Sequence, residues 1–370
     1  MSNNKDFTLG DMITLQRGFD ITKSEQTRGI YPVVSSSGIT SYHSEYKVKG
    51  PGVVIGRKGT LGTAFYIEQD FWPHDTSLWV KEFNGNDPYY VYCLLRTLHL
   101  EKLDSGSANP TLNRNYAHQI PTRKVPVDVQ KNISKVIRSI DNKHKINTHI
   151  CAELEAMAKT LYDYWFTQFD FPNAEGKPYR SSGGEMVWND QLKREIPKGW
   201  EVTTMAALTT VLTGKEDANF STPNGKYKFF TCAQETILCD SPAFSGHAVL
   251  IAGNGDFNVK HYTGDFNAYQ RTYVLIPKEA KHYAVMYIAA QKRIQAFKQG
   301  SNGSIVKFIT KGDVESIPII LPDNDVYLDT LNRILEKIEH CERENNELTK
   351  LRDWLLPMLM NGQIVVVDRP

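Results

Sequence analysis

The stretch GPGVVIGRKGTLGTAFY, residues 50–66, returns in diverged form as GHAVLIAGNGDFNVKHY, residues 246–262. The two stretches lie 196 positions apart and align without a gap. The same shift pairs identical residues within and beyond them: Gly18 with Gly214, Tyr31 with Tyr227, Gly50 with Gly246, Val53 with Val249, Ile55 with Ile251, Gly59 with Gly255, Tyr66 with Tyr262 and Thr76 with Thr272. Solenoid repeats have periods of only about 20 to 50 residues. The sequence therefore predicts one domain present twice, which suits a protein that binds two related things at a fixed separation.

Each copy combines short β-like runs, separated by Gly, Ser and Pro, with a long helical pattern that follows them. We therefore predict an α/β (α+β) fold, in which two duplicated globular domains are separated by two long helices that form an antiparallel coiled coil. The expected divisions are a first domain over 1–126, a first long helix over 127–168, a connector over 169–199, a second domain over 200–322, a second long helix over 323–362 and a tail over 363–370. Near the end of the first domain, residues 106–126 predict a loop, then a strand and then a proline stop. In the connector, Trp188 and the Ile196-Pro197 step are expected to anchor the chain to a neighbouring surface.

Both long helices carry apolar residues at alternating spacings of three and four, which is the a/d pattern of a coiled coil. The predicted seam positions are Ile133, Ile137, Ile140, Asn147, Leu154 and Leu161 in the first helix, and Leu331, Ile334, Ile338, Asn345, Leu348 and Leu355 in the second. An Asn in a seam costs stability but can fix register and orientation; the alternative is that both Asn side chains lie at an exposed rim. Helices of about 38 and 34 residues would span about 57 and 50 Å. Because the lengths match, an antiparallel pair between the domains is the economical arrangement.

Composition limits the function classes. The formal net charge is +1, so bulk basicity does not drive binding to nucleic acid, and the isolated chain is expected to bind DNA weakly. The N-terminus MSNNKDFTLG lacks the apolar segment of a signal peptide, and no run of 18 apolar residues occurs. The five cysteines are scattered and odd in number, as in a reducing compartment. A cytoplasmic location is expected.

Motifs for catalysis are weak throughout. Neither a GxSxG elbow nor a nucleotide P-loop is present. Asp265 with Glu279-Ala280-Lys281 loosely fits the carboxylates of a metal-dependent nuclease, but the second motif follows Pro277 and opens a predicted helix. We therefore expect no catalytic residue, no cofactor-binding residue and no metal ligand in this chain.

The polar loops of both domains offer donors that suit base edges and phosphates. The candidate DNA-binding residues are Arg57, Lys58, His74, Asn113, Arg114 and Tyr116 in the first copy, and Asn254, Lys260, Tyr269, Gln270, Arg271 and Lys307 in the second, where His261 lies among the matching loops. At the shift of 196, scaffold residues agree whereas loop residues differ. This is the pattern expected when two copies of one fold read two different sequences, although neutral drift after duplication is the plainer alternative for any single residue.

Four segments together resemble one known family. They are MAKTLYDYWFTQFDFP (157–172), GKPYRSSGGEMVWNDQLKREIPKGWEV (176–202), GVVIGRKGTLG (52–62) and LRDWLLPMLMNGQI (351–364). Over essentially its whole length the chain resembles the specificity (S) subunit of type I restriction–modification systems. The second copy departs from the family pattern at GNGDFN (253–258), where the longer glycine turn is lost.

The resemblance implies two target recognition domains, each reading one half of a split site in double-stranded DNA, with the helices setting the gap. It implies a non-catalytic subunit that recruits two methyltransferase (modification) subunits and two restriction/translocase subunits. S-adenosylmethionine, ATP and Mg²⁺ are then expected on those partners and no cofactor in this chain. The alternatives are a metal-dependent nuclease with duplicated DNA-binding domains and a two-headed scaffold that binds proteins or glycans.

Overall fold

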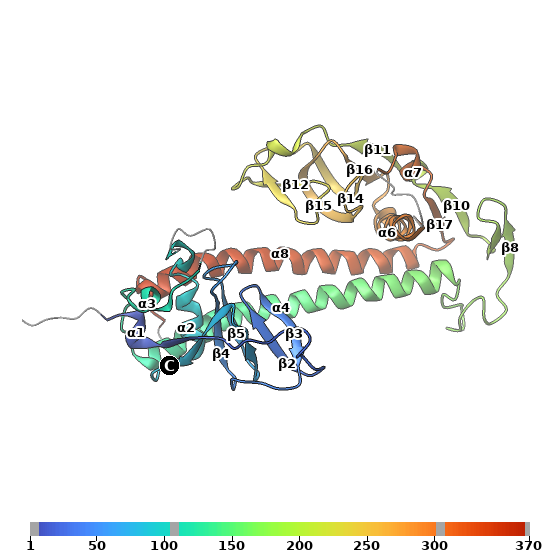
Figure 1. The fold of residues 1–370 in the computed structure, drawn as a ribbon. Coiled ribbons are helices and arrows are strands. Elements are labelled where there is room, and N and C mark those ends of the chain that lie inside the picture. The colour runs from blue at the N-terminus through green and yellow to red at the C-terminus, as the bar shows by residue number, and fades with distance from the viewer. Residues whose placement is uncertain (1–6, 104–110, 301–307, 367–370) are drawn as a thin grey trace, which may run out of the picture. The chain divides into compact units, whose positions relative to one another are not determined.

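The computed structural model describes residues 7–103, 111–300 and 308–366, and Figure 1 shows its fold. The chain forms two compact units, which consist of residues 1–145 with 345–370 and of residues 146–344. Each unit holds one globular domain together with part of each long helix.

The first unit builds two small sheets. Its elements are α1 (Leu9–Met12), β1 (Thr14–Arg17), β2 (Tyr31–Ser35), β3 (Gly38–His43), β4 (Gly52–Gly56), β5 (Ala64–Ile67), β6 (Trp72–Pro73), β7 (Ser77–Glu82), α2 (Pro88–Leu95), η1 (Leu100–Leu103) and α3 (Arg114–His118). The larger sheet has the antiparallel order β1-β7-β4-β5, and the smaller has the order β3-β2-β6. Helix α2 starts sharply because Asp87 accepts a hydrogen bond from the Tyr90 backbone at 2.8 Å and Pro88 occupies the first turn.

The second unit gathers its main strands into one sheet. Its elements are β8 (Met186–Asn189), β9 (Arg194–Pro197), β10 (Glu201–Thr204), α5 (Met205–Leu208), β11 (Thr209–Thr213), η3 (Ala218–Phe220), β12 (Tyr227–Phe230), β13 (Ile237–Cys239), β14 (Phe244–Ala252), β15 (Val259–Ala268), β16 (Thr272–Pro277), η4 (Ala280–His282), α6 (Tyr283–Gly300), α7 (Lys311–Glu315) and β17 (Pro318–Leu321). The main sheet has the order β11-β16-β14-β15-β12-β13, while β10 pairs with β17 and β8 with β9.

The two domains repeat the same strand order. The order β1-β7-β4-β5 of the first domain corresponds to β11-β16-β14-β15 of the second. The repeated apolar residues Val53 and Ile55 lie on β4 and are fully buried, as are their counterparts on β14. The repeated glycines Gly59 and Gly255 both have positive φ, +76° and +70°, between the paired strands. The predicted duplication is therefore a duplication of fold.

Two long helices, α4 (Val127–Tyr162) and α8 (Val326–Asn361), follow the two domains, and a π-helical segment η2 (Asp163–Thr167) continues α4. In the first unit, Ile133 and Ile137 of α4 share a core with Leu356 and Leu359 of α8. The start of α4 therefore lies against the end of α8.

In the second unit the partners are reversed, because Ala158 and Tyr162 of α4 share a core with Leu331 and Ile338 of α8. Within each unit the two helical segments thus run antiparallel. The predicted fold class is confirmed, with two α/β domains and an antiparallel coiled coil.

The seam positions differ in burial. Ile133, Ile137, Ile140, Leu331, Ile334 and Ile338 are buried, whereas Leu154, Leu161, Asn345, Leu348 and Leu355 are half-buried. Asn147 is almost fully buried, and its Nδ2 donates to Glu344 Oε2 at 2.7 Å. Its amide therefore lies inside the second unit's helix pair and not at an exposed rim.

Two local expectations were wrong. The region expected to end in a strand instead contains the short helix α3, which Asn113 caps by accepting a hydrogen bond from Asn115 N at 2.9 Å. Trp188 does not anchor the connector, since 61% of its surface is exposed and its Nε1 donates to Asp190. The outward position of Trp188 on the two-stranded β8–β9 hairpin explains this. Ile196 on β9 is the buried residue.

Candidate nucleic-acid interface

The turn between β4 and β5 presents two cationic residues of the first domain. Gly59 and Gly62 have φ of +76° and +74°, a conformation that favours glycine, and Gly62 N donates to Gly56 O at 2.9 Å to close the turn. Lys58 is exposed and Arg57 is half-buried. The glycine-rich sequence thus produces a tight turn that carries two cations.

Arg57 lies beside the turn before β7. Its backbone N donates to Thr76 O at 3.0 Å, and its Nη1 donates to Asp75 O at 3.3 Å. The Asp75 carboxylate itself pairs with Arg17 at 2.8 Å. Among the residues that the structure describes, no carboxylate pairs with Arg57, so its guanidinium retains donors for a ligand.

His74 belongs to the same cluster. Its Nδ1 lies 3.0 Å from Thr76 Oγ1 and 3.0 Å from Asp75 Oδ1. Burial acts to raise the pKa of Asp75, but the hydrogen bond from Arg17 and the charges of His74 and Arg17 outweigh it and lower that pKa. Asp75 is therefore ionised at neutral pH and holds both Arg17 and the His74 ring at the cluster.

A cleft of about 640 Å³ adjoins Lys58. The residues that line it are Ile21, Thr22, Lys23, Gln26, Ser35, Ser36, Ser37, Thr40, Ser41, Lys58, Gly59, Thr60, His74 and Thr76. Hydroxyl, amide, ammonium and imidazole groups converge there, and such groups bind phosphates and base edges. Apart from Lys58 and His74, sequence reasoning missed these residues. The serine run at 35–37 was the available signal.

The remaining candidates of the first domain join this cluster through the backbone. Lys58 forms a β-bridge with Thr111, and Leu112 N donates to Arg57 O at 2.9 Å. This places α3 next to the turn, with Arg114 and Tyr116 exposed and Asn113 capping the helix. The six candidates of the first domain therefore belong to one surface region.

The second domain repeats this arrangement with other side chains. Gly253 N donates to Arg271 O at 2.9 Å, so the turn after β14 lies against the turn before β16. Asn254 is half-buried in the first turn, while Gln270 and Arg271 are exposed in the second. Tyr269 is half-buried and forms a β-bridge with Glu216. Lys307 lies outside the described residues.

The side chains of Lys260 and His261, which are neighbours on β15, point in different directions. Lys260 lines a cleft of about 390 Å³ with Lys228 and Gln234, and its Nζ donates to Ala233 O at 2.5 Å. Burial lowers the pKa of Lys260. Although His261 also lines this cleft, its ring is buried against Glu339 of α8, at 3.1 Å. The grouping of His261 with the exposed recognition loops is therefore wrong, because strand alternation turns it towards the helices.

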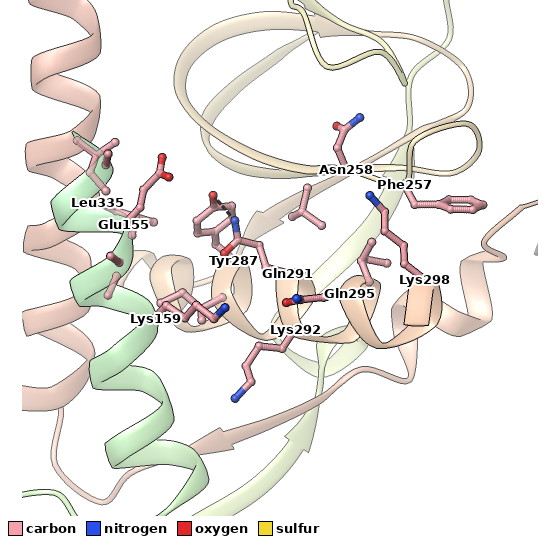
Figure 2. A pocket seen from close by; sticks show the side chains of 17 residues that line it. Glu155, Lys159, Phe257, Asn258, Tyr287, Gln291, Lys292, Gln295, Lys298 and Leu335 are labelled. Atoms are coloured by element: carbon pink, nitrogen blue, oxygen red, sulfur yellow. Dashed lines mark hydrogen bonds between the residues drawn. The ribbon is translucent and has the colours of Figure 1, made fainter. Parts of the chain in front are cut away.

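A further pocket of about 650 Å³ lies in the second unit between α4, α6, α8 and the β14–β15 turn, and Figure 2 shows it. Its labelled polar side chains are Glu155, Lys159, Asn258, Tyr287, Gln291, Lys292, Gln295 and Lys298. Gln291 Nε2 donates to Tyr287 Oη at 2.6 Å, and Lys292 pairs with Asp163. Sequence reasoning did not identify this pocket, since its walls come from segments distant in the chain.

Within residues 7–103, 111–300 and 308–366, no three His, Cys, Asp or Glu side chains are grouped as a metal ion would require. None of the helices in the described part of the chain combines the length and the apolar character that crossing a membrane requires.

The comparison with protein families decides the classification. The type I restriction modification DNA specificity domain matches residues 1–156 and 197–350. The chain belongs to this family. The two matched stretches each contain one of the duplicated domains, so the chain carries two DNA specificity domains. The alternatives of a metal-dependent nuclease and of a two-headed scaffold are not favoured.

Individual relatives agree with this assignment. The chain is 35% identical to the type I restriction enzyme EcoDI specificity subunit of Escherichia coli over 177 residues, which cover 46% of this chain and 40% of that subunit. It is 24% identical to the MjaIX specificity subunit of Methanocaldococcus jannaschii over 75% of this chain and 69% of that subunit. With the HindI specificity subunit of Haemophilus influenzae it shares 22% identity over 98% of this chain and the full length of that subunit.

One solved structure is similar in fold. It is the type I restriction–modification S subunit from M. genitalium, with a TM-score of 0.65 and 14% identity over 100% of this chain and 98% of that one. At this identity the likeness concerns the fold alone. It supports a fold that combines two domains with long helices.

Proposed function

We propose that this chain reads a bipartite site in double-stranded DNA, with one recognition domain for each half-site, and is not itself catalytic. The proposal rests on two adjoining turns that occur at the same positions in both domains but carry different side chains. Arg57-Lys58 of the first domain corresponds to Gly253-Asn254 of the second, and His74-Asp75 corresponds to Gln270-Arg271. A common scaffold with different donors suits two different half-sites.

The long helices would set the distance between the half-sites. The proposed partners are two methyltransferase subunits and, in the complete assembly, two restriction/translocase subunits. S-adenosylmethionine would be held by the former, and ATP and Mg²⁺ by the latter. Since the partners act on cellular DNA, we place the complex in the cytoplasm.

Uncovered apolar side chains on the two long helices support partner binding. Helix α4 and its π-helical continuation expose Ile146, Met157 and Tyr164, which follow one face in the second unit. Helix α8 exposes Leu351 and Trp354 in the first unit.

These exposed residues also repeat in sequence. Leu161-Tyr162-Asp163-Tyr164 ends the first helix, and Leu351-Arg352-Asp353-Trp354 lies near the end of the second. The exposed aromatic residue has the same place in both motifs. Two equivalent surfaces fit two copies of one partner, for which we assign the methyltransferase subunit.

The direct test is methylation mapping in a host that lacks its own modification systems. The chain would be expressed with its cognate methyltransferase subunit, and each component alone would serve as control. We expect one bipartite methylated sequence that requires both components. Methylation by the partner alone, or at a contiguous site, would overturn the proposal.

A further inference from the structure

A hydrogen bond between a tyrosine and a carboxylate joins the first recognition domain to its long helix. Tyr89, in the first turn of α2, donates its hydroxyl to Asp141 Oδ2 of α4 at 2.7 Å. The other oxygen of Asp141 accepts from Arg352 Nη1 of α8 at 3.2 Å. Tyr89 is 7% exposed and the Asp141 side chain is 22% exposed, so the contact is partly shielded from water. Such a hydrogen bond is directional.

Gln130 of α4 forms a second contact with the same end of α2. The side chain of Gln130 on α4 accepts from Asp87 N at 2.9 Å and donates to Asn86 Oδ1 at 2.7 Å. Gln130 is fully buried. One amide and one carboxylate of α4 therefore hold the N-terminus of α2.

The second unit repeats this construction with different residues. Tyr283, the first residue of α6, donates its hydroxyl to Glu339 Oε1 of α8 at 2.7 Å, and the His261 ring lies 3.1 Å from the same oxygen. Asn332 of α8 accepts from Ala284 N at 3.0 Å and donates to Lys281 O at 2.7 Å. Again one amide and one carboxylate hold the N-terminus of the domain's helix.

The buried carboxylate of the second unit is charged. Burial acts to raise the pKa of Glu339, but hydrogen bonds from His261, Tyr283 and Thr263 outweigh it and lower that pKa. A buried charge with several donors tolerates little rotation of its partners, because any displaced donor leaves it unsatisfied. The pair thus resists tilting of the domain against the helix.

We infer that Tyr89–Asp141 and Tyr283–Glu339 are positioning pairs, which hold each recognition domain at one orientation on its long helix and thereby restrict the spacer length that the protein accepts between half-sites. This inference rests on the proposed reading of a bipartite site. Apolar packing is less directional than a hydrogen bond, so a domain held by packing alone can tilt relative to its helix. The two tyrosine–carboxylate hydrogen bonds fix the orientation that packing leaves variable.

Tyr90 provides a matched control for the first pair. It follows Tyr89 in α2 and is fully buried, yet its hydroxyl has no hydrogen-bond partner among the described residues. Tyr89→Phe and Tyr90→Phe each remove one buried hydroxyl from adjacent positions. Only the first removes a contact to the long helix.

The experiment measures methylation of the natural site and of sites with a spacer one base pair longer or shorter, using the chain with its methyltransferase. For Tyr89→Phe and Tyr283→Phe we expect the half-sites to stay unchanged. The ratio of methylation at altered spacers to methylation at the natural spacer should rise about tenfold or more above that of the wild-type protein, which is the factor that loss of a hydrogen bond to a charged group represents. Tyr90→Phe should match the wild-type protein. Asp141→Asn tests the same pair without loss of side-chain volume.

Thermal unfolding of each variant separates positioning from stability. A lower Tm with unchanged spacer preference in Tyr89→Phe, Asp141→Asn and Tyr283→Phe would overturn the inference, as would equal relaxation by Tyr90→Phe. If the wild-type protein shows no bipartite methylation, the proposed function fails instead. The two failures are thus distinguishable.

Discussion

At the scale of single residues, Arg57 lies in the turn after β4 and Arg271 lies in the turn before β16. These turns are the two adjoining turns of the repeat, and neither Arg forms an ion pair among the described residues. An Arg side chain can bind guanine O6 and N7 together, with discrimination of roughly 1–3 kcal/mol. We expect Arg57→Ala to relax or abolish recognition of one half-site only, and Arg271→Ala to do the same for the other.

Methylation mapping of each variant checks this division of labour. A useful control is Arg17→Ala, which removes the ion pair to Asp75 without touching the turn that carries Arg57. If Arg57→Ala relaxed both half-sites or neither, the assignment of one domain to one half-site would be contradicted. If the Arg side chains only stabilised their turns, both variants would lower Tm and methylate the original sequence.

Glu339 gives the second unit a predictable pH dependence. Its pKa lies below the ordinary value of 4.5 in the folded chain, so the unfolded chain binds a proton more readily than the native one. Its stabilisation is therefore fully present above pH 4.5 and is lost as the pH falls through the lowered value. We expect Glu339→Gln to reduce the free energy of unfolding by about 1–3 kcal/mol at neutral pH.

Thermal or denaturant unfolding at a series of pH values measures this effect. The difference between Glu339→Gln and the wild-type protein should shrink as the pH drops below 4.5. A difference that stayed constant down to acid pH would show that side-chain packing, and not the charge, accounts for the loss.

Residue-scale prediction from sequence worked where a residue's surroundings are local. Gly59 and Gly255 could be assigned to turns because their chemistry and spacing demand it. His261 could not be placed correctly, since its partner Glu339 is 78 positions away and no local sequence pattern predicts a buried contact between them. The serine run at 35–37 is visible in the sequence, but its neighbours Lys58 and Thr76 lie 22 and 40 positions from Ser36, so the cleft that they form together was missed.

At the scale of elements, periodicity predicted both long helices, and the glycine turns separated the strands. The structure of the segment before α4 was harder to predict from sequence, because Asn113 can start either a loop or a helix. The structure shows that it caps helix α3. The predicted seam is buried at its Ile positions, where branched side chains pack between helices, and half-buried at most of its Leu positions. Burial along the seam depends on which domain covers each segment, and the sequence pattern does not contain that information.

The helices also allow a test of spacing. Asn147 of α4 contacts Glu344 of α8 within the second unit. Because the two helical segments run antiparallel, seven residues inserted after Asn147 in α4 lie opposite seven residues inserted before Glu344 in α8. A heptad adds about 10.5 Å and keeps nearly the same helix face. We expect the spacer to lengthen by about three base pairs, since each contributes about 3.4 Å, with both half-sites unchanged.

Methylation mapping again supplies the measurement. Insertion into α4 alone is the control, because it breaks the pairing of the helices and should lower Tm without yielding a new defined spacer. An unchanged spacer after the matched insertion would show that the helices do not set the distance.

At the scale of the whole molecule, the duplication extends from the recognition domains to the helix surfaces that carry Tyr164 and Trp354. If each surface binds one methyltransferase subunit, the loss of one surface should leave a complex with a single copy. We expect Tyr164→Ala and Trp354→Ala each to reduce the stoichiometry from two partners to one, and the double variant to abolish binding. Large exposed aromatic side chains at the centre of an interface commonly contribute 2 kcal/mol or more, roughly a thirtyfold change in affinity.

Mass measurement of the purified complexes decides the point, for example by light scattering coupled to size exclusion. Trp188→Ala is a matched control, since it removes an exposed tryptophan from the connector hairpin, outside both repeated motifs. Full occupancy in the double variant would exclude these surfaces as the docking sites. Loss of both partners from either single substitution would mean that the two copies bind only together, and the two surfaces could then not act independently.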